Sequence, residues 1–274
     1  MAVKRDAMTP AFPVPAWLVG CGNMAGAMVD GWRAGGTDLT GITVIRPSGT
    51  PVEGVTTLTA YPDGETPRFV MLGFKPQKLD EIAPDLATRC GPQTIIVSLL
   101  AGVEVASLRA RFPQVRAIVR VMPNLPVAIG AGVVAVHGDR DAADEVMELM
   151  SPLGLVMATA RETGLAGIGA IAGAGPAYVA RFADALAAAG RAHGVEGDAL
   201  AIALQALGGT AALMQATGED GASLARRVAS PNGTTEAGLA VLDQDGALDR
   251  LIEATIAAAI ARGRQLAQAA AGRG

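Results

Sequence analysis

Short apolar runs alternate with turn-forming and helix-forming stretches in the first 160 residues. The runs cover residues 16–20, 42–46, 69–73, 94–98, 117–122 and 132–136. Several are apolar throughout, which is typical of strands that are covered on both faces. Because the runs are short and bounded by Gly or Pro, the pattern predicts strands of an α/β domain rather than buried helices.

The pattern changes beyond residue 160, where apolar positions recur at helical spacing over 178–189, 198–216 and 247–270. Of the 16 prolines, 14 lie before this point, and alanine becomes much more frequent after it. We therefore predict a flexible leader over 1–15, an α/β domain over 16–160 and an all-α domain over 161–274. The last helix carries an apolar stripe that its own domain or a second subunit must cover: Leu248, Leu251, Ile252, Ile256, Ile260 and Leu266.

The composition of the chain argues against several kinds of binding partner. The net charge is −4 and aromatic residues make up 3% of the chain, which argues against nucleic-acid binding. Gly, Pro or a charge interrupts each apolar run before the roughly 18–20 residues that a membrane span needs, so we expect no membrane association. Cys21 and Cys90 fit no metal or disulfide pattern. We expect a cytoplasmic protein without a metal, and the leader does not resemble a secretory signal.

The first predicted strand runs into a glycine turn of the form G-x-G-x-x-A, which precedes an apparent helix. Gly20 permits the tight turn, Gly22 lets the backbone approach a pyrophosphate, and Ala25 allows close helix packing. The apparent helix covers 27–33, and its N-terminus offers free N–H groups to an anion. We also assign the turn residues Asn23 and Met24 to the cofactor site. The turn predicts a dinucleotide site; the alternative is an ordinary glycine-rich turn.

The end of the second predicted strand suggests which dinucleotide is bound. NAD-selective sites usually carry a carboxylate there, but this chain has Arg46, Pro47 and Ser48. Arg46 and Ser48 suit a 2'-phosphate, which favours NADPH over NADH. The alternative is that Arg46 is a solvated charge at the end of a strand.

A hydroxyl-rich loop lies between helical stretches in the second domain. It comprises Ser230, Pro231, Asn232, Gly233, Thr234 and Thr235. Hydroxyls and helix-start amides can bind a small carboxylate without a buried cation, although a plain helix cap would have the same composition. Lysines occur only at positions 4, 75 and 78, so the helical domain has no lysine acid or base. This inventory favours reduction of a C=N bond over oxidation of an alcohol.

Six motifs occur together along the chain: GCGNMAGAM at 20–28, FKPQ at 74–77, SLLAGV at 98–103, RVMPNLP at 120–126, AGAGPAY at 172–178 and VASPNGTTEAGL at 228–239. In this order they resemble the pyrroline-5-carboxylate reductase family over almost the whole chain after the leader. The resemblance implies an N-terminal Rossmann-like NADP-binding domain and an all-α C-terminal dimerisation domain. It also implies reduction of 1-pyrroline-5-carboxylate to L-proline in proline biosynthesis, in a homodimer with active sites at the subunit interface or in a larger ring of dimers.

The resemblance also suggests residue roles. Ser230, Gly233 and Thr234 would bind the substrate carboxylate, and Thr235 would hydrogen-bond the ring nitrogen as the catalytic residue. Glu162 stands where the family often has an acidic residue on the substrate side. Cofactor-side positions are matched by Lys75, Pro76, Ala101 and Asn124.

Two departures from the family pattern leave alternatives open. Asn232 replaces the first glycine of the usual SPGGTT, and Ala172 and Ala174 replace the serines of SGSGPAY. A related cyclic imine acid, such as piperideine carboxylate, is one alternative substrate. A catalytically silent NADP-binding dimeric scaffold is another reading. A β-hydroxyacid dehydrogenase is disfavoured because its typical catalytic lysine has no counterpart here.

Overall fold

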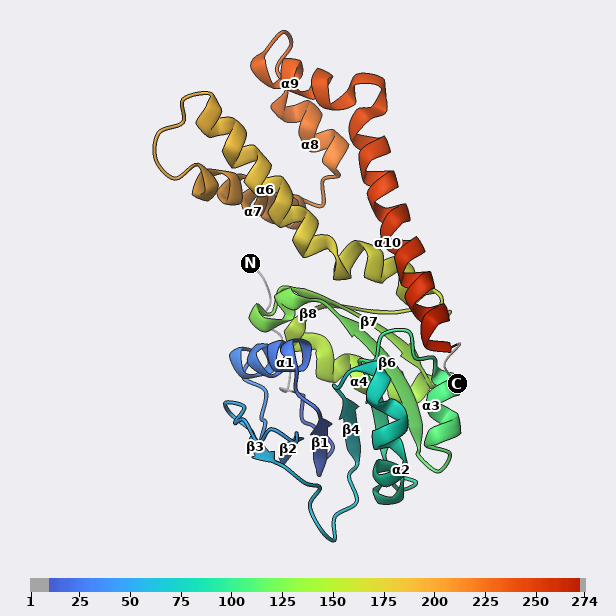
Figure 1. The fold of residues 1–274 in the computed structure, drawn as a ribbon. Helices are drawn as coiled ribbons and strands as arrows, with labels where there is room; N and C mark the ends of the chain where they lie inside the picture. Colours follow the sequence, from blue (N-terminus) through green and yellow to red (C-terminus); the bar gives the residue numbers. More distant parts are fainter. Residues whose placement is uncertain (1–9, 272–274) are drawn as a thin grey trace. The chain divides into compact units, whose positions relative to one another are not determined.

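The computed structural model describes residues 10–271, and the chain divides into two compact units (Figure 1). One unit contains the chain up to Ala174 and again from Ile260, and the other spans Gly175–Ala259. The first unit extends past residue 160 because Leu165 and Ala170 are buried in it. The domain boundary between residues 160 and 161 stays a prediction.

The first unit contains an eight-stranded sheet in the order β3-β2-β1-β4-β5-β6-β7-β8. All neighbouring strands are parallel except β6 and β7, which are antiparallel. The order of β1–β6 is that of a Rossmann fold, so the predicted α/β class is confirmed. The strands are β1 (Ala16–Val19), β2 (Ile42–Ile45), β3 (Thr56–Leu58), β4 (Phe69–Leu72), β5 (Ile95–Ser98), β6 (Ala117–Pro123), β7 (Gly132–Gly138) and β8 (Gly154–Ala158).

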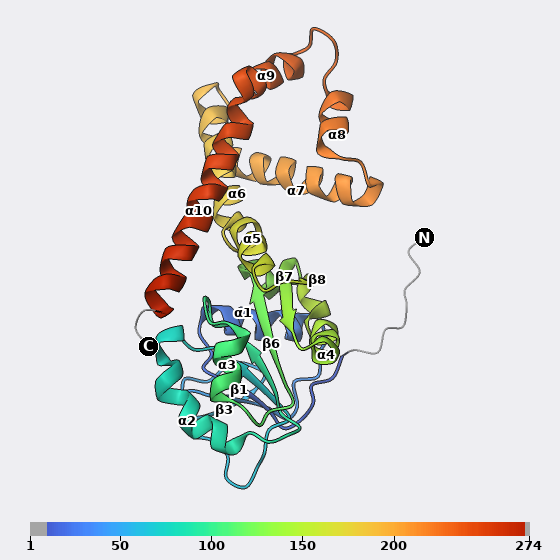
Figure 2. The same cartoon turned by 90° about the vertical axis from the view of Figure 1, so that its right-hand side faces the viewer.

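Helices cover both faces of this sheet, which explains why its central strands are apolar throughout (Figure 2). Side chains of α1 (Asn23–Ala34) and α4 (Arg140–Met150) pack in one buried cluster, and those of α2 (Leu79–Arg89) and α3 (Val105–Arg111) pack in the other. Trp32 Nε1 donates a 2.7 Å hydrogen bond to the Leu149 carbonyl and so ties α1 to α4.

All six predicted strands are present, and the sequence pattern missed β3 and β8. Both lie at the edges of the sheet and bury little: β3 has only three residues, and Leu155 in β8 is 62% exposed. An edge strand that is open on one side need not be apolar, and its pattern is correspondingly weak.

The predicted flexible leader is wrong for its last residues. Phe12 is buried, and its ring makes edge-to-face contacts with Trp32 at 4.9 Å and Phe69 at 5.3 Å between centroids. Aromatic rings in this arrangement contribute both buried area and favourable electrostatics. Residues 1–9 of the leader lie outside the described residues.

The second unit is helical, as predicted, but it has almost no core of its own. Between residues 175 and 259 the buried side chains are Ala183, Ala187, Ala199, Ala203 and Leu224. The predicted helices at 178–189, 198–216 and 247–270 are confirmed. The helices from residue 164 onward are α5 (Gly164–Ile168), η4 (a π-helix, Gly169–Gly173), α6 (Gly175–Ala192), α7 (Ala199–Thr217), α8 (Gly221–Val228), α9 (Thr234–Asp243), η5 (a 3-10 helix, Gln244–Gly246) and α10 (Ala247–Ala271).

The first part of the predicted apolar stripe of α10 is exposed to solvent in the single chain, while Ile256 and Ile260 are half-buried. Leu251 is 64% exposed and Ile252 51% exposed. The side chain of Leu266, the last residue of the predicted stripe, lies outside the described residues. The stripe is therefore available for a second subunit.

Two helical stretches, Gly164–Ala192 and Ala199–Thr217, are long and apolar enough to cross a membrane on length and composition alone. This corrects the expectation that no run reaches that length. The glycines inside this stretch, Gly208 and Gly209, do not break α7, and the helix contains no charge. Length and composition are weak evidence for a membrane span, because a helix that packs in a subunit interface has the same composition.

Candidate functional site

The glycine turn lies at the carboxyl edge of the sheet, between β1 and α1. Gly20 has φ of +78°, a conformation that disfavours other residues. Gly22 is the N-cap of α1, and no side chain caps this helix. Helix α1 begins at Asn23, so the amides of Asn23, Met24 and Ala25 belong to its first turn, where a helix has no internal partners for them. The turn thus presents amide donors to an anion.

The backbone is open at Gly22 in this turn, whereas Gly73 after β4 packs closely against the turn. A Cβ added at Gly22 would meet no atom within 4 Å, which leaves the backbone open to a ligand. The opposite holds at Gly73, which directly follows β4. A Cβ there would lie 2.5 Å from the Gly20 carbonyl oxygen and 3.1 Å from the Ala25 side chain. Gly73 is therefore a site residue that no motif predicts, because its role depends on packing between two strands.

Arg46 and Ser48 meet in the loop after β2. Arg46 Nε donates to Ser48 Oγ at 2.9 Å, and Thr50 Oγ1 bonds the same oxygen at 3.1 Å. Burial raises the pKa of the Cys21 thiol, while the charge of Arg46 acts to lower it. Arg46 therefore lies within electrostatic reach of the glycine turn. Thr50 was not identified from the sequence, because the turn that brings it to Ser48 has no motif.

Other predicted cofactor-side residues also follow strands at this edge. Lys75 and Pro76 begin the short helix after β4, and Ala101 lies in the turn after β5. Asn124, after β6, is buried and has a structural role. Its Nδ2 donates to the Ala172 carbonyl at 2.8 Å, and its Oδ1 accepts from the Val133 amide at 2.8 Å. The Asn124 side chain therefore connects the end of β6 to the π-helix.

Glu162 lies in the first unit, and its carboxylate accepts hydrogen bonds from other residues of that unit. Its Oε1 accepts hydrogen bonds from the Val105 amide at 2.8 Å and from Arg120 Nη1 at 2.7 Å. The Arg120 side chain is 14% exposed and that of Glu162 26%, so this ion pair is partly shielded from water. The carboxylate joins β6 to the start of α3. These bonds give Glu162 a structural contact within the first unit, and its substrate-side role stays a prediction.

The hydroxyl-rich loop forms a closed turn at the start of α9 in the second unit. The Gly233 amide donates to the Ser230 carbonyl at 2.9 Å, and Gly233 is the N-cap of α9. A Cβ at Gly233 would lie 2.4 Å from Ser230 Oγ and 2.9 Å from the Ser230 carbonyl oxygen, so only glycine fits. Thr234 and Thr235 form the first turn of α9. The structure thus brings hydroxyls and helix-start amides together in one turn.

An ion pair spans α8, the helix before this loop. Arg227 Nη2 donates to Glu219 Oε2 at 2.7 Å, and Arg227 Nε is 3.2 Å from each carboxylate oxygen. Arg227 lowers the pKa of Glu219 through this contact. The pair links the residue before the α8 N-cap to the last turn of the helix, next to the start of the hydroxyl-rich loop.

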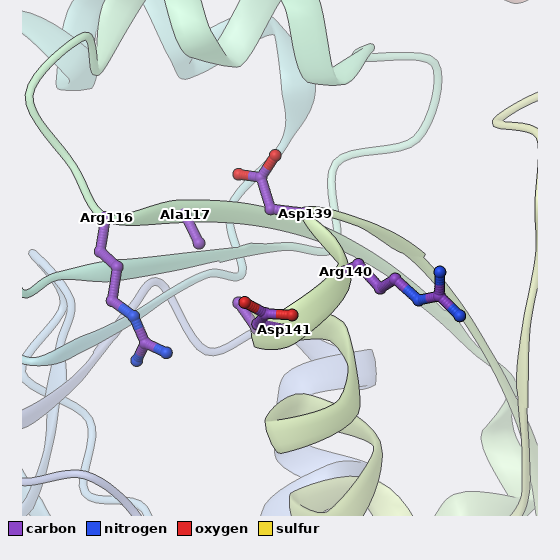
Figure 3. Close-up of a pocket in the computed structure, with 6 residues that line it drawn as sticks. Arg116, Ala117, Asp139, Arg140 and Asp141 are labelled. Carbon is purple, nitrogen blue, oxygen red and sulfur yellow. The ribbon is translucent and has the colours of Figure 1, made fainter.

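A hollow of about 290 Å³ lies at the opposite edge of the sheet, where β6 begins and β7 ends (Figure 3). Two of its charged side chains are paired with residues outside its lining: Asp139 with Arg109 and Arg116 with Glu145. It is far from the glycine turn along the strands and adds nothing to the candidate site. Among the described residues no cluster of His, Cys, Asp or Glu could hold a metal ion.

The fold and the two loops define the class of the protein. A Rossmann sheet order, a glycine turn at the β1–α1 junction and a basic residue after β2 are the features of a nicotinamide-dependent oxidoreductase. The helical unit adds the exposed apolar surface of an oligomer-forming region.

Comparisons with known proteins identify the family. Residues 162–266 match the dimerisation region of pyrroline-5-carboxylate reductases. The chain is 30% identical over 266 residues to the pyrroline-5-carboxylate reductase of Pseudomonas aeruginosa, covering 92% of this chain and 96% of that protein. It is 37% identical over 194 residues to the Synechocystis enzyme, covering 69% and 72%. The chain belongs to the pyrroline-5-carboxylate reductase family.

A solved structure supports the same assignment over the whole fold. The pyrroline-5-carboxylate reductase of Coxiella burnetii matches with a TM-score of 0.84 at 27% identity, covering 93% of this chain and 99% of that one. The matched dimerisation region also shows that the protein forms a homo-oligomer.

Proposed function

We propose that this protein reduces 1-pyrroline-5-carboxylate to L-proline with NADPH, as an oxidoreductase of proline biosynthesis. The observation that carries the proposal is the turn of residues 230–235, where three hydroxyls and the first amides of α9 converge in a family member with a dinucleotide turn. We place the reaction in the cytoplasm and assign a homodimer as the minimal assembly, with a ring of dimers as a larger form.

The residues at the carboxyl edge of the sheet fit a phosphorylated dinucleotide. The α1 amides of Asn23, Met24 and Ala25 would hold the pyrophosphate, and the open space at Gly22 admits it. Arg46 and Ser48 would hold the 2'-phosphate, because a guanidinium and a hydroxyl already meet there. When bound, the reduced nicotinamide would supply the hydride for the imine carbon. Lys75, Pro76, Ala101 and Asn124 would shape the rest of this edge.

The hydroxyl-rich turn would bind and orient the substrate. Ser230, Gly233 and Thr234 would donate to the carboxylate, whose charge also favours the amide end of α9. Thr235 Oγ1 would hydrogen-bond the ring nitrogen and relay the proton that this nitrogen gains on reduction. Because no strong acid or base is required, holding the imine in a productive orientation contributes most of the rate enhancement.

The test is an assay with purified protein, NADPH and 1-pyrroline-5-carboxylate, followed at the nicotinamide absorbance band. Thr235→Ala should lower kcat/KM by roughly 10- to 1000-fold, about 1–4 kcal/mol, because a transition-state hydrogen bond is lost. Thr217→Ala is the matched control, since that hydroxyl bonds the Leu213 carbonyl within α7.

Two results would contradict this assignment. Wild-type kinetics in a folded Thr235→Ala variant would remove Thr235 from the mechanism. Failure of folded wild-type protein to turn over either this imine or its piperideine homologue would favour the silent-scaffold alternative. Turnover of the piperideine acid alone would identify a different cyclic imine as the substrate.

A separate measurement tests the assignment of NADPH as the cofactor. Arg46→Ala should lower the NADPH-to-NADH ratio of kcat/KM by about 10- to 100-fold, because a hydrogen bond to a charged group is lost. If wild-type protein used NADH as well as or better than NADPH, the assignment of a 2'-phosphate site to Arg46 and Ser48 would be wrong.

A further inference from the structure

We propose that Glu236 is a positioning residue for the substrate turn, residues 230–235. Its carboxylate holds Asn232 in a left-handed conformation and keeps the turn closed before the acid binds. The inference rests on the proposed function, in which this turn binds the substrate carboxylate.

Asn232 adopts an unfavourable backbone conformation. Its φ is +58°, and besides Asp245 it is the one non-glycine residue with positive φ within residues 10–271. Asparagine tolerates this region better than most residues but still prefers negative φ. In the related SPGGTT pattern a glycine occupies this position. Something else must therefore hold the residue in place here.

Glu236 supplies that restraint from one turn along α9. Its Oε2 accepts the Asn232 amide hydrogen bond at 2.6 Å, a short distance typical of a charged acceptor. The glutamate occupies the position of a capping-box acid, but it bonds the residue before the N-cap Gly233. Asn232 is thereby tied to the helix that carries Thr234 and Thr235.

In the closed turn, the hydroxyls of Ser230 and Thr234 are held where both can donate to the same substrate carboxylate. Gly233 has no room for a side chain because Ser230 Oγ and the Ser230 carbonyl oxygen lie against it. If Asn232 relaxes to negative φ, the turn closed by the bond from the Gly233 amide to the Ser230 carbonyl changes its type, and Ser230 moves relative to Thr234. The apparent affinity for an acid falls in proportion to the fraction of turns that remain closed.

The same contact explains why an acidic residue is tolerated beside an anion site. A free carboxylate at position 236 would repel the substrate carboxylate. With its Oε2 on the Asn232 amide and its position in the first turn of α9, the negative charge faces amide dipoles instead. The turn can therefore present its hydroxyls and amides to the substrate.

The experiment compares steady-state kinetics of three variants in the full-length protein. Glu236→Ala should raise KM for the imine about 3- to 10-fold with kcat within about twofold, because a closed conformer is lost rather than a transition-state contact. KM for NADPH should not change. Glu236→Gln keeps an acceptor oxygen at the same reach and should restore KM to within about twofold of wild type.

Asp198→Ala is the matched control, since Asp198 caps α7 by accepting from the Ala201 amide at 2.9 Å. It should lower the melting temperature through loss of a helix cap without a change in KM. An unchanged KM in Glu236→Ala, or an equal rise in Asp198→Ala, would overturn the proposal.

Hydrogen exchange of the Asn232 amide gives a readout that does not depend on turnover. Exchange should be about fivefold faster in Glu236→Ala than in wild type, because the acceptor is lost. If wild-type protein does not reduce the imine, the proposed function fails, and faster exchange still supports the restraint. Equal exchange in the two proteins would overturn it in either case.

Discussion

The two units of this chain differ in how many large apolar side chains they bury. The α/β unit packs two buried clusters, one on each face of its sheet, with large side chains such as Trp17, Trp32 and Phe69 fully enclosed. The helical unit encloses four alanines and Leu224, while Phe182, Leu251 and other large apolar residues remain exposed. The first unit has a core that can stabilise it alone, and the second does not.

This difference indicates where the helical unit obtains its stability. Burial of apolar side chains is the main favourable term in folding, and a unit that leaves them exposed gains little from folding by itself. In a homo-oligomer the second copy supplies the missing contacts. Folding of the helical unit and subunit association are therefore expected to be one process.

The largest expected effect comes from placing a charge on the exposed stripe of α10. Leu251→Glu should abolish dimerisation, because a two-fold interface contains the charge twice and each unpaired buried charge costs about 3–5 kcal/mol. Light scattering after gel filtration measures the change. The helical circular dichroism signal should fall with it.

Leu58→Glu is the control in the α/β unit, at an apolar residue of edge strand β3 that is 38% exposed. It should leave the oligomer intact. A Leu251→Glu protein that elutes as the wild type does would show that α10 lies outside the interface.

A smaller effect is expected from a cavity in the α/β unit. Trp32→Ala removes a ring that packs on Phe12 and the hydrogen bond to Leu149, and it should lower the free energy of unfolding by about 3–5 kcal/mol. Trp17, the other tryptophan of the chain, then reports denaturation by fluorescence. The loss should not depend on protein concentration. A concentration-dependent loss would show that this unit also relies on its partner.

The smallest effect is a loss of stability at high pH, confined to the α/β unit. Burial raises the pKa of Cys90 from 9.0 to about 12 and that of Tyr61 from 10.0 to about 12. The unfolded chain releases these protons near their ordinary pKa values and the folded chain keeps them. The free energy of unfolding should therefore fall as pH rises from 9 towards 12.

Tryptophan fluorescence can follow this change, because both tryptophans belong to the α/β unit. The denaturation midpoint should be lower at about pH 10.5 than at about pH 8, and Cys90→Ala should reduce the difference. A midpoint that is level over this range would contradict the assigned pKa directions.

The sequence predicts the α/β unit well because local and tertiary signals agree there. The run Ala16–Val19 is apolar throughout and is followed at once by the glycine turn, so strand, turn and helix are all apparent from neighbouring residues. The same agreement made the helices α6, α7 and α10 predictable. The fold class and the family follow from these elements.

The remaining features depend on contacts between distant residues. Phe12 was assigned to a flexible leader because its partners, Trp32 and Phe69, are far away in the sequence. Glu162 and Asn124 have the residue types of ligand-binding groups, but their bonds to Val105 and Ala172 become visible only in three dimensions. For the same reason the positions of Gly73 and Glu236 in the site were not predicted.

The uncharged helix α7 has a consequence for the newly synthesised chain. Until a second copy arrives, most of a 19-residue helix with the composition of a membrane span is exposed to water. In newly synthesised subunits, pairing then competes with aggregation and with adsorption to lipid. The fraction that pairs depends on how fast two copies meet. At low abundance, adsorption to lipid, which needs one chain, gains over pairing, which needs two, so the yield of active enzyme is expected to rise more steeply than in proportion to the amount of chain produced until aggregation competes.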